Sequence, residues 1–253
     1  MAKDATKPAV GGVLDTIAPV VTAIGALLTT LGFILAFTTA GVVIGASVDG
    51  VELIGDEMIS NQLLFSQKIF YFHMPAGATS MIALAFTAYY GIRFLMTRDA
   101  RYDLRARVAT EVGTVLVLFT MFSGLMWERF EWGVWWTWEP RLTTYLILTL
   151  LVVAYFVLRA AIDEPERRAL FSSVYGIIMF IDVPICFMIT RLVPSSIHPT
   201  IFRTDSGLSP DMLVPMLLVM FGMFCIAFGL FRLRLRVEVV AERLEALQRR
   251  IDE

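Results

Sequence analysis

Two histidines and a run of tryptophans are the residues of this chain whose types and positions could bind a ligand. His73 lies in the segment YFHMPAG and His198 in the segment PSSIHPT, and the 253 residues contain no other histidine. All the tryptophans fall within twelve residues, at Trp127, Trp132, Trp135, Trp136 and Trp138. Neutral imidazole is a ligand of iron, zinc and copper, and indole rings provide flat apolar surface. A flat, metal-containing ligand suits this combination.

Haem fits these residues better than a bare metal ion does. A zinc site needs three or four protein ligands, and Cys186 and Cys225 lie in separate apolar runs and form no CxxC pair. Haem iron already has four porphyrin nitrogens and needs only axial ligands, commonly histidine. Aromatic rings can pack on the macrocycle, and Arg141 is a cation suited to its propionates. The residues therefore predict one haem held by His73 and His198.

Both features also have a purely structural interpretation. A histidine near a membrane interface is often a packed polar residue, and tryptophans commonly form an interfacial aromatic belt that anchors a protein. A belt is usually spread over both membrane faces, whereas here every tryptophan lies in one segment. This concentration favours a binding role, and an interfacial anchor remains the alternative.

The tryptophan-rich segment has a helical spacing. Trp132, Trp135, Trp136 and Glu139 follow one another at i, i+3, i+4 and i+7, which places them on one face of a helix. Pro140 would end or kink that helix, because the residue before a proline disfavours the α region. The pattern predicts a short amphipathic helix lying in the outer membrane interface.

The elements that position these residues are long apolar runs. The chain is 57% hydrophobic and only 17% charged, with a mean hydropathy of +0.72, which is typical of a polytopic membrane protein. Six runs could each form a transmembrane helix, near 20–45, 74–97, 108–126, 144–161, 169–190 and 213–232. We expect an all-α membrane domain over 1–232, with the tryptophan-rich motif at 127–144, and a cytoplasmic C-terminal helix over 233–253. A break in the first run is expected near Gly41 and Gly45.

The distribution of basic residues predicts the orientation. Of the 21 lysines and arginines, sixteen lie on the side of the membrane that holds the two termini and the second and fourth connections. Because basic residues concentrate on the cytoplasmic side, both termini are expected in the cytoplasm. The segments 46–73, 127–143 and 191–212 then face outward, and they bring both histidines and all the tryptophans to one face.

The segment WGVWWTWEPRLT, residues 132–143, resembles the tryptophan-rich signature of proteins that handle haem in cytochrome c maturation. Within that superfamily the chain is similar to the haem exporter protein C family, CcmC, whose usual pattern is close to W-G-T-W-W-x-W-D-x-R-L-T. The segment YFHMPAG resembles that family's first histidine motif, and His198 takes the position of its second histidine. The similarity covers about residues 60–232, and the six-span length also agrees.

The resemblance implies an integral protein of the bacterial inner membrane that binds haem b at its outer, periplasmic face. It implies delivery of this haem to the haem chaperone CcmE, within a complex that contains the ABC-type subunits CcmA and CcmB and the small membrane protein CcmD. It implies a transfer and assembly factor rather than an enzyme. His73 and His198 would be the axial ligands. A platform at the haem edge would be formed by Trp132, Trp135, Trp136 and Trp138, and the motif would be completed by Gly133, Glu139 and Arg141.

Two positions depart from the family pattern. Val134 replaces the usual threonine, and Glu139-Pro140 replaces an aspartate followed by a residue other than proline. A W-D-P form is more typical of the larger relatives CcmF and CcsA, which have more spans and histidines, so a haem-attachment subunit of that kind is an alternative. Two others are a b-type electron-transfer subunit, which usually carries four mid-span histidines, and a transporter without haem.

Two further features have less direct interpretations. Asp182 lies inside an apolar run, where an unpartnered carboxylate is expensive; it could steady a ligand histidine or a freed N–H, or form an ordinary interhelical hydrogen bond. The tail carries an apolar stripe at spacings of 4, 3, 4, 3 and 4, composed of Leu233, Val237, Val240, Leu244, Leu247 and Ile251. We expect the tail helix to dock on a partner such as the ABC subunits, or alternatively to lie on the lipid surface.

Overall fold

The computed structural model describes residues 12–40, 61–193, 196, 198 and 210–252, and these contain six α-helices and no strand. The helices are α1 (Val13–Thr38), α2 (Asn61–Thr97), α3 (Ala100–Glu131), α4 (Pro140–Ala160), α5 (Pro165–Leu192) and α6 (Pro210–Asp252). All six are long and apolar enough to cross a membrane. This confirms the predicted all-α class and six spans, and the protein is a multi-pass membrane protein.

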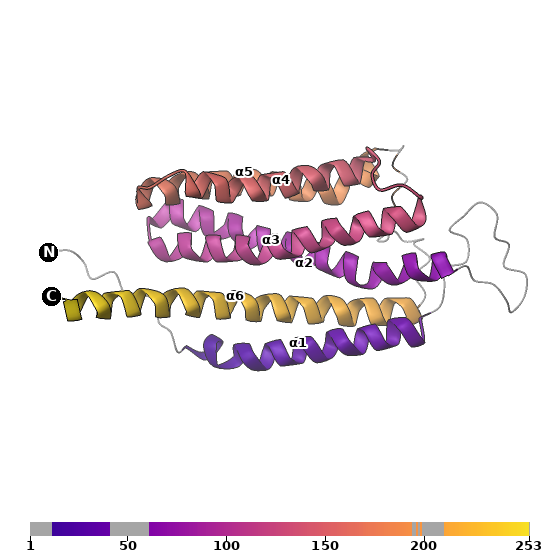
Figure 1. Ribbon diagram of the computed structural model, residues 1–253, viewed down its shortest axis with the longest axis horizontal. Coiled ribbons are helices and arrows are strands. Elements are labelled where there is room, and N and C mark those ends of the chain that lie inside the picture. Colours follow the sequence, from indigo (N-terminus) through magenta and orange to yellow (C-terminus); the bar gives the residue numbers. More distant parts are fainter. Residues whose placement is uncertain (1–11, 41–60, 194–195, 197, 199–209, 253) are drawn as a thin grey trace, which may run out of the picture.

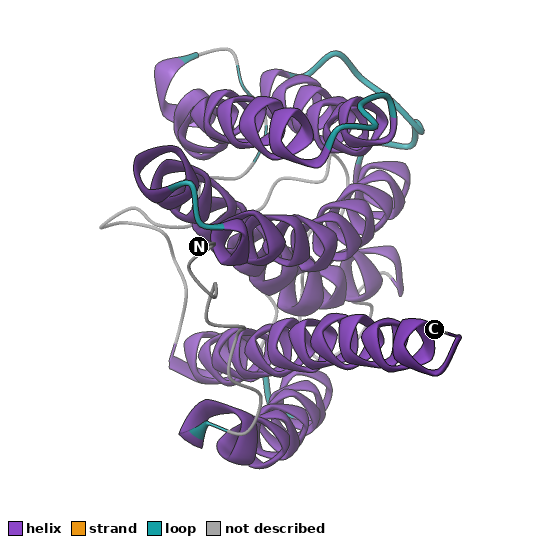
Figure 2. Cartoon of the chain, turned by 90° about the vertical axis from the view of Figure 1, so that its left-hand side faces the viewer, coloured by secondary structure: helices purple, strands orange, loops and turns teal. Residues whose placement is uncertain are grey.

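The helices pack in two groups. α2, α3, α4 and α5 surround the main apolar core, in which Leu84, Val117, Leu148 and Met179 are fully buried. α6 lies against α2 and α3, and α1 packs mainly on α6, at the edge of the bundle (Figures 1 and 2). The α2–α5 group therefore positions the residues of interest, and α1 lies away from them.

Small residues allow α1 and α6 to approach closely. A Cβ added at Gly25 or Gly32 of α1 would collide with Cys225 or Val219 of α6. In the opposite direction, Gly222 and Gly229 of α6 face the hydroxyl groups of Thr29 and Thr22. Lipid provides little hydrophobic drive for helix association, so close packing between small residues is what holds such a pair together. An ion pair between Asp15 and Arg232 adds to it.

The bundle has two chemically different ends. The aromatic end is formed by the end of α3, residues 132–139, the start of α4 and the end of α5. The charged end holds the short α2–α3 and α4–α5 connections, and α6 projects beyond it (Figure 1). The described parts of the segments predicted to share one membrane face thus lie at one end of the bundle.

Three element bounds differ from those expected. α1 covers 13–38, so the expected break near Gly41 and Gly45 lies outside the described residues. α2 begins at Asn61 instead of near residue 74, so 61–73 is helix, not loop. α6 runs without interruption through the tail to Asp252, so 233–252 continues the sixth span instead of forming a separate helix.

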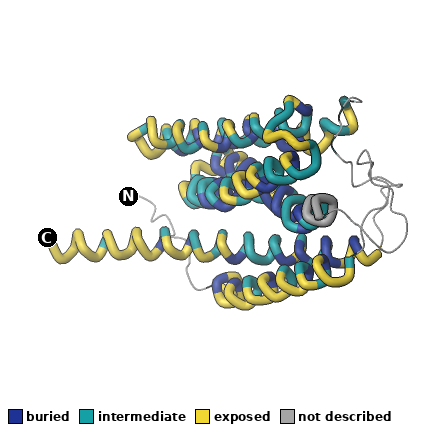
Figure 3. Tube along the Cα trace, turned by 45° about the vertical axis from the view of Figure 1, so that its right-hand side comes forward, coloured by how far each residue is buried: buried dark blue, intermediate teal, exposed yellow. Residues whose placement is uncertain are grey.

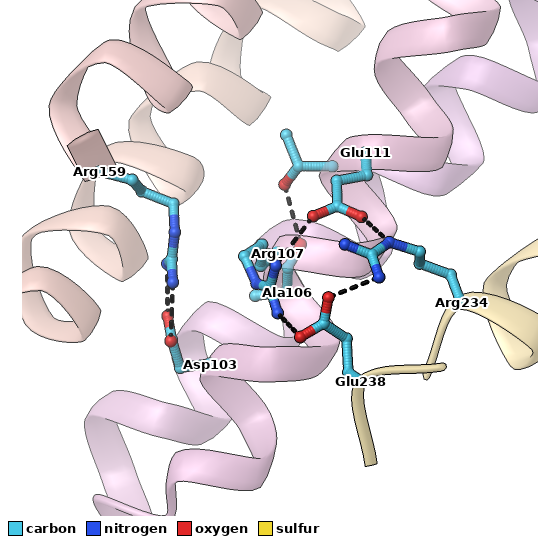
Figure 4. Close-up of polar contacts among 8 residues, drawn as sticks. Asp103, Ala106, Arg107, Glu111, Arg159, Arg234 and Glu238 are labelled. Atoms are coloured by element: carbon cyan, nitrogen blue, oxygen red, sulfur yellow. Dashed lines mark hydrogen bonds and ion pairs between the residues drawn. The ribbon is translucent and has the colours of Figure 1, made fainter. Parts of the chain in front are cut away.

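Paired charges join three helices at the charged end (Figure 4). Arg107 of α3 contacts both Glu111, at 3.1 Å, and Glu238 of α6, at 2.7 Å. Arg234 of α6 reaches the same two carboxylates, at 2.7 and 2.5 Å. Arg159 of α4 separately binds Asp103 of α3 through two hydrogen bonds of 2.6 and 3.0 Å. Each of these carboxylates therefore has a cationic partner within the chain.

Candidate functional site

His73 lies within α2 and faces α3. Its Nδ1 atom is 2.9 Å from the hydroxyl of Ser123. A Cβ added at Gly124 would lie only 3.1 Å from Cε1 of His73, so the ring packs directly against the glycine backbone. The sequence analysis placed His73 at the end of the outward segment 46–73. In the structure α2 begins twelve residues before His73, so this histidine is held by a rigid helix and not by a loop.

His198 reaches the same part of α3 from the segment that follows α5. Its ring centroid is 5.7 Å from that of Trp127, with an angle of 41° between the planes. Trp127 is one helical turn after Ser123 and also contacts Trp132 edge to face, at 5.1 Å between centroids. The two histidines therefore lie against adjacent turns of one helix, His73 at Ser123 and Gly124 and His198 at Trp127.

The predicted interfacial helix over the tryptophan-rich segment is wrong. α3 ends at Glu131, Trp132 is its C-cap, and residues 132–139 form turns and irregular structure. Gly133 has a φ of +74°, a left-handed conformation that suits glycine and terminates helices. Pro140 occupies the first turn of α4, where its missing N–H is harmless, and so begins a helix instead of ending one.

The irregular backbone divides the tryptophans into two sets. Trp127, Trp132 and Trp136 are partly buried, whereas Trp135 and Trp138 are 60% and 75% exposed. Trp136 contacts Trp138 edge to face at 5.5 Å, and the Arg129 guanidinium lies over the ring of Trp135 at 5.9 Å. The partly buried set links the segment to the bundle, and the exposed pair presents bare indole surface.

Glu139 fastens this segment to its surroundings. One carboxylate oxygen accepts hydrogen bonds from the backbone N–H groups of Arg141, at 2.8 Å, and Leu142, at 3.2 Å, which caps α4. The other accepts a hydrogen bond from the hydroxyl of Ser196, two residues before His198. Glu139 therefore acts on the position of His198 through the chain that carries it.

Arg141 lies at the start of α4, at the aromatic end. Its guanidinium interacts electrostatically with His73 of α2 and with Cys186 of α5. This places a positive charge beside the first histidine, as the sequence suggested.

Glu128 is a candidate site residue that the sequence prediction did not single out. The Glu128 side chain is fully buried, and neither carboxylate oxygen has a hydrogen-bond partner among the described residues. The hydroxyl and the backbone N–H of Thr137 lie close enough to stabilise its charged form, whereas the Glu139 carboxylate opposes it. A buried carboxylate without a cationic partner is costly, which makes Glu128 a candidate site residue. Its position beside Trp127, inside the tryptophan-rich motif 127–144, was a signal available in the sequence.

Asp182 makes a local contact. Its carboxylate accepts a hydrogen bond from the thiol of Cys186, one turn later in α5, at 3.5 Å. That contact is neither the expected interhelical bond nor a contact with a histidine. The thiol in turn lies close to Arg141, so Asp182 is one residue removed from the cluster around His73.

The chain is similar to known proteins over most of its length. The family model of heme exporter protein C, CcmC, matches residues 3–250. Heme exporter protein C of Rhodobacter capsulatus is 29% identical over 196 residues, or 72% of this chain and 77% of the relative. The protein of the same name from Escherichia coli is 28% identical over 174 residues, covering 68% and 69%. A ccmC-like mitochondrial protein of cytochrome c biosynthesis from Marchantia polymorpha is 32% identical over 169 residues, covering 65% and 69%. This chain belongs to the heme exporter protein C family.

Proposed function

We propose that this protein binds haem b at the aromatic end of the bundle, with His73 and His198 as axial ligands. The observation that carries the proposal is the placement of both histidines against adjacent turns of α3, through Ser123 and Trp127. The residues fit the group: two imidazoles, an aromatic border, and a cation beside one imidazole. Haem, when bound, supplies an iron that accepts one nitrogen ligand on each face.

The surrounding residues have separable roles in this proposal. Trp127 and Trp132 border the ligand next to His198, and Trp136 supports the exposed ring of Trp138. Arg141 pairs with a haem propionate. Gly133 sets the turn of the segment, and Glu139 holds the segment to the chain before His198.

Trp135 and Trp138 face outward and form the surface from which haem is passed on. A partner protein that receives haem can cover these two rings, since exposed aromatic side chains are typical anchors of protein interfaces. We assign the haem chaperone CcmE as the partner that binds this surface. The protein would act in a complex with CcmA, CcmB and CcmD, in the bacterial inner membrane, with the aromatic end in the periplasm and both termini in the cytoplasm.

The other functions considered fit less well. Membership of the heme exporter protein C family argues against a haem-attachment subunit of the CcmF or CcsA kind. An electron-transfer subunit needs cofactors spaced across the membrane, whereas both histidines lie at one end of the bundle. An anchoring role for the tryptophans does not account for the fully buried carboxylate of Glu128 beside them.

The test is an absorption spectrum of the purified full-length protein and of His73→Ala and His198→Ala. The intact protein should bind one haem with a low-spin, six-coordinate spectrum, and each variant should lose this spectrum or retain much less haem. Cys225→Ser, in the distant α1–α6 interface, serves as the control for handling and insertion. Wild-type spectra from both histidine variants would refute the ligand assignment.

A further inference from the structure

The hydrogen bonds around His73 indicate which ring nitrogen carries its proton. The Ser123 hydroxyl donates to the backbone carbonyl of Thr120, one turn earlier in α3, at 3.1 Å. With its hydrogen committed there, the Ser123 oxygen can only accept a hydrogen bond from Nδ1 of His73, 2.9 Å away. The Thr120 carbonyl, itself an acceptor, is also within reach of the ring. The Ser123 oxygen therefore favours an N–H at Nδ1, and the Thr120 carbonyl favours an N–H on the ring.

We infer that Ser123 is a positioning residue that holds neutral His73 in the tautomer protonated at Nδ1. The lone pair is then on Nε2, which is the nitrogen free to bind a metal. Which ring nitrogen binds a metal is set by the hydrogen bond of the other nitrogen, and loss of such a partner typically lowers metal affinity about 10–100-fold. Gly124 makes this possible, because the ring can approach α3 only where no side chain intervenes. The inference rests on the proposed function only in assigning a use to Nε2.

Nitrogen-15 NMR of selectively labelled histidine tests the tautomer without any haem. The chain has only two histidines, so His198→Ala leaves the ring nitrogens of His73 alone in the spectrum. At about pH 8.5, where an ordinary imidazole is neutral, the protonated nitrogen should couple to the ring carbon hydrogens in the pattern of Nδ1–H. Adding Ser123→Ala should produce a mixture of tautomers. Ser123→Thr, which keeps the hydroxyl, should restore the single form.

Haem titration of Ser123→Ala in the otherwise intact chain completes the test. We expect a roughly tenfold or greater loss of affinity. Ser172→Ala removes a buried hydroxyl that has no hydrogen-bond partner among the described residues, and it should have no effect. A dominant Nε2–H tautomer in the parent protein overturns the inference and leaves the ligand assignment intact. A wild-type haem spectrum in His73→Ala instead overturns the proposed function.

An independent observation concerns the far end of α6. Beyond the charged end this helix continues as a straight rod, exposed on all sides toward its terminus (Figures 1 and 3). Its base is fixed to the bundle by the buried side chains of Leu235 and Val239 and by the ion pairs of Arg234 and Glu238. The apolar stripe of the tail does not pack on the bundle. All six of its members are exposed, namely Leu233, Val237, Val240, Leu244, Leu247 and Ile251.

Charge is arranged asymmetrically beside this stripe. In heptad terms one flank carries an arginine every seven residues, at Arg236, Arg243 and Arg250. The other flank carries Arg234, already paired with Glu111, followed by Ala241 and Gln248. Two parallel copies would set arginines against alanine and glutamine, and two antiparallel copies would set arginine against arginine. A second copy of this chain therefore offers no charge complementarity.

The geometry also disfavours a lipid surface. No glycine or proline interrupts residues 231–252, and the helix is continuous with a membrane span. At 1.5 Å per residue, the 13 residues from Val240 to Asp252 project about 20 Å beyond the base. Most of the stripe is consequently held away from the bilayer.

We propose that the tail of α6 docks a protein helix with an apolar face flanked by acidic residues, on the side of the membrane that holds the charged end. Covering the stripe removes its six apolar side chains from water, and acidic residues on the partner pair with Arg236, Arg243 and Arg250. The CcmA and CcmB subunits, co-expressed with the full-length chain, serve as the probe. Leu244→Arg/Leu247→Arg and Arg243→Glu/Arg250→Glu should each lower their co-purification about tenfold or more. Glu242→Lys, on the opposite face of the rod, should not.

A fluorophore on Leu247→Cys, in a Cys225→Ser background, identifies the occupant. A blue shift that requires the co-expressed subunits supports the proposal. A shift produced by anionic nanodiscs alone, or by concentrating the chain alone, overturns it in favour of lipid or of self-association. Unchanged co-purification of both double variants also overturns it, and haem spectra of the same samples report separately on the aromatic end.

Discussion

The carboxylates at the charged end of the bundle and Glu128 at its aromatic end differ in the partners that they have. At the charged end, Glu111 and Glu238 each contact two arginines, and Asp103 is held by both terminal nitrogens of Arg159. At the aromatic end, Glu128 is fully buried without a hydrogen-bond partner among the described residues, and two indole rings are largely exposed. Paired charges stabilise the helices, whereas unpaired and exposed groups retain the capacity to bind something else. The difference supports the proposed placement of the haem site at the aromatic end.

The largest expected effect follows from removing the exposed indoles. Trp135→Ala/Trp138→Ala should lower the rate of haem transfer to the chaperone at least about tenfold, because interface aromatic anchors commonly contribute 2 kcal/mol or more each. Haem binding should persist, since the rings that adjoin His198 remain. A stopped-flow transfer assay measures the rate.

The control is Phe171→Ala, a similarly exposed aromatic side chain on α5. Phe171→Ala should reduce membrane insertion as much as the loss of any other single anchoring aromatic ring does. It should leave the rate of haem transfer unchanged. If the tryptophan variant loses membrane insertion while transfer per inserted molecule stays normal, the tryptophans are anchors.

Crowding His73 should have the next largest effect. Gly124→Ala places a methyl group 3.1 Å from the His73 ring, which must shift by a few tenths of an ångström. The low-spin haem spectrum should weaken, because axial ligands tolerate little displacement. Absorption and electron paramagnetic resonance spectra monitor this change.

Gly113→Ala provides a matched control, since its added methyl group would lie at the same 3.1 Å from a side-chain carbon of Leu84 in the core. Both variants should lose comparable thermal stability, and only Gly124→Ala should change the spectrum. Equal spectral effects would show that general loosening of the bundle is responsible.

The comparison between the two ends predicts opposite stability changes for two glutamates. Glu128→Gln replaces a buried carboxylate whose polar contacts are with Thr137 and not with a cation, and it should raise stability by about 1–3 kcal/mol. Glu111→Gln breaks partly exposed ion pairs and should lower it by about 1 kcal/mol or less. Thermal unfolding followed by size-exclusion chromatography measures both. If Glu128→Gln is destabilising, its carboxylate has a structural partner and the contrast between the ends fails.

The six spans could be predicted because their apolar character is a property of consecutive residues. The start of α2 could not, because Lys68 interrupts the apolar pattern there; in the structure its ammonium group donates hydrogen bonds to the carbonyls of Ala36 and Ala40 at the end of α1. Helical spacing over Trp132–Glu139 was misleading, because the backbone conformation of Gly133 overrides a side-chain pattern. The continuity of α6 was hidden by the change from apolar to charged composition at residue 232.

The candidate site was partly accessible from sequence for a similar reason. Rare residue types identified His73, His198 and the tryptophan-rich segment directly. Ser123 was not identified, and Trp127 was grouped only with the other tryptophans. The roles of both depend on contacts with α2 and with the chain after α5, between residues that are 50 and 71 positions apart in sequence. Serine is common and carries no signal until its partner is known.

The smallest effect is expected at Asp182, which tests where the site ends. Among the described residues, its carboxylate accepts a hydrogen bond from the Cys186 thiol of the same helix, a weak donor to which an asparagine oxygen can also bind. Asp182→Asn should therefore change haem affinity by less than about twofold and thermal stability by less than about 1 kcal/mol. Both are measured on the purified protein beside Cys186→Ser, which alters the same contact from its other side. The site would have to extend into α5 if Asp182→Asn weakened haem binding strongly, because the carboxylate would then act on His73 through Cys186 and Arg141. A null result confines the ligand-binding residues to α2, α3, the tryptophan-rich segment with the start of α4, and the chain around His198.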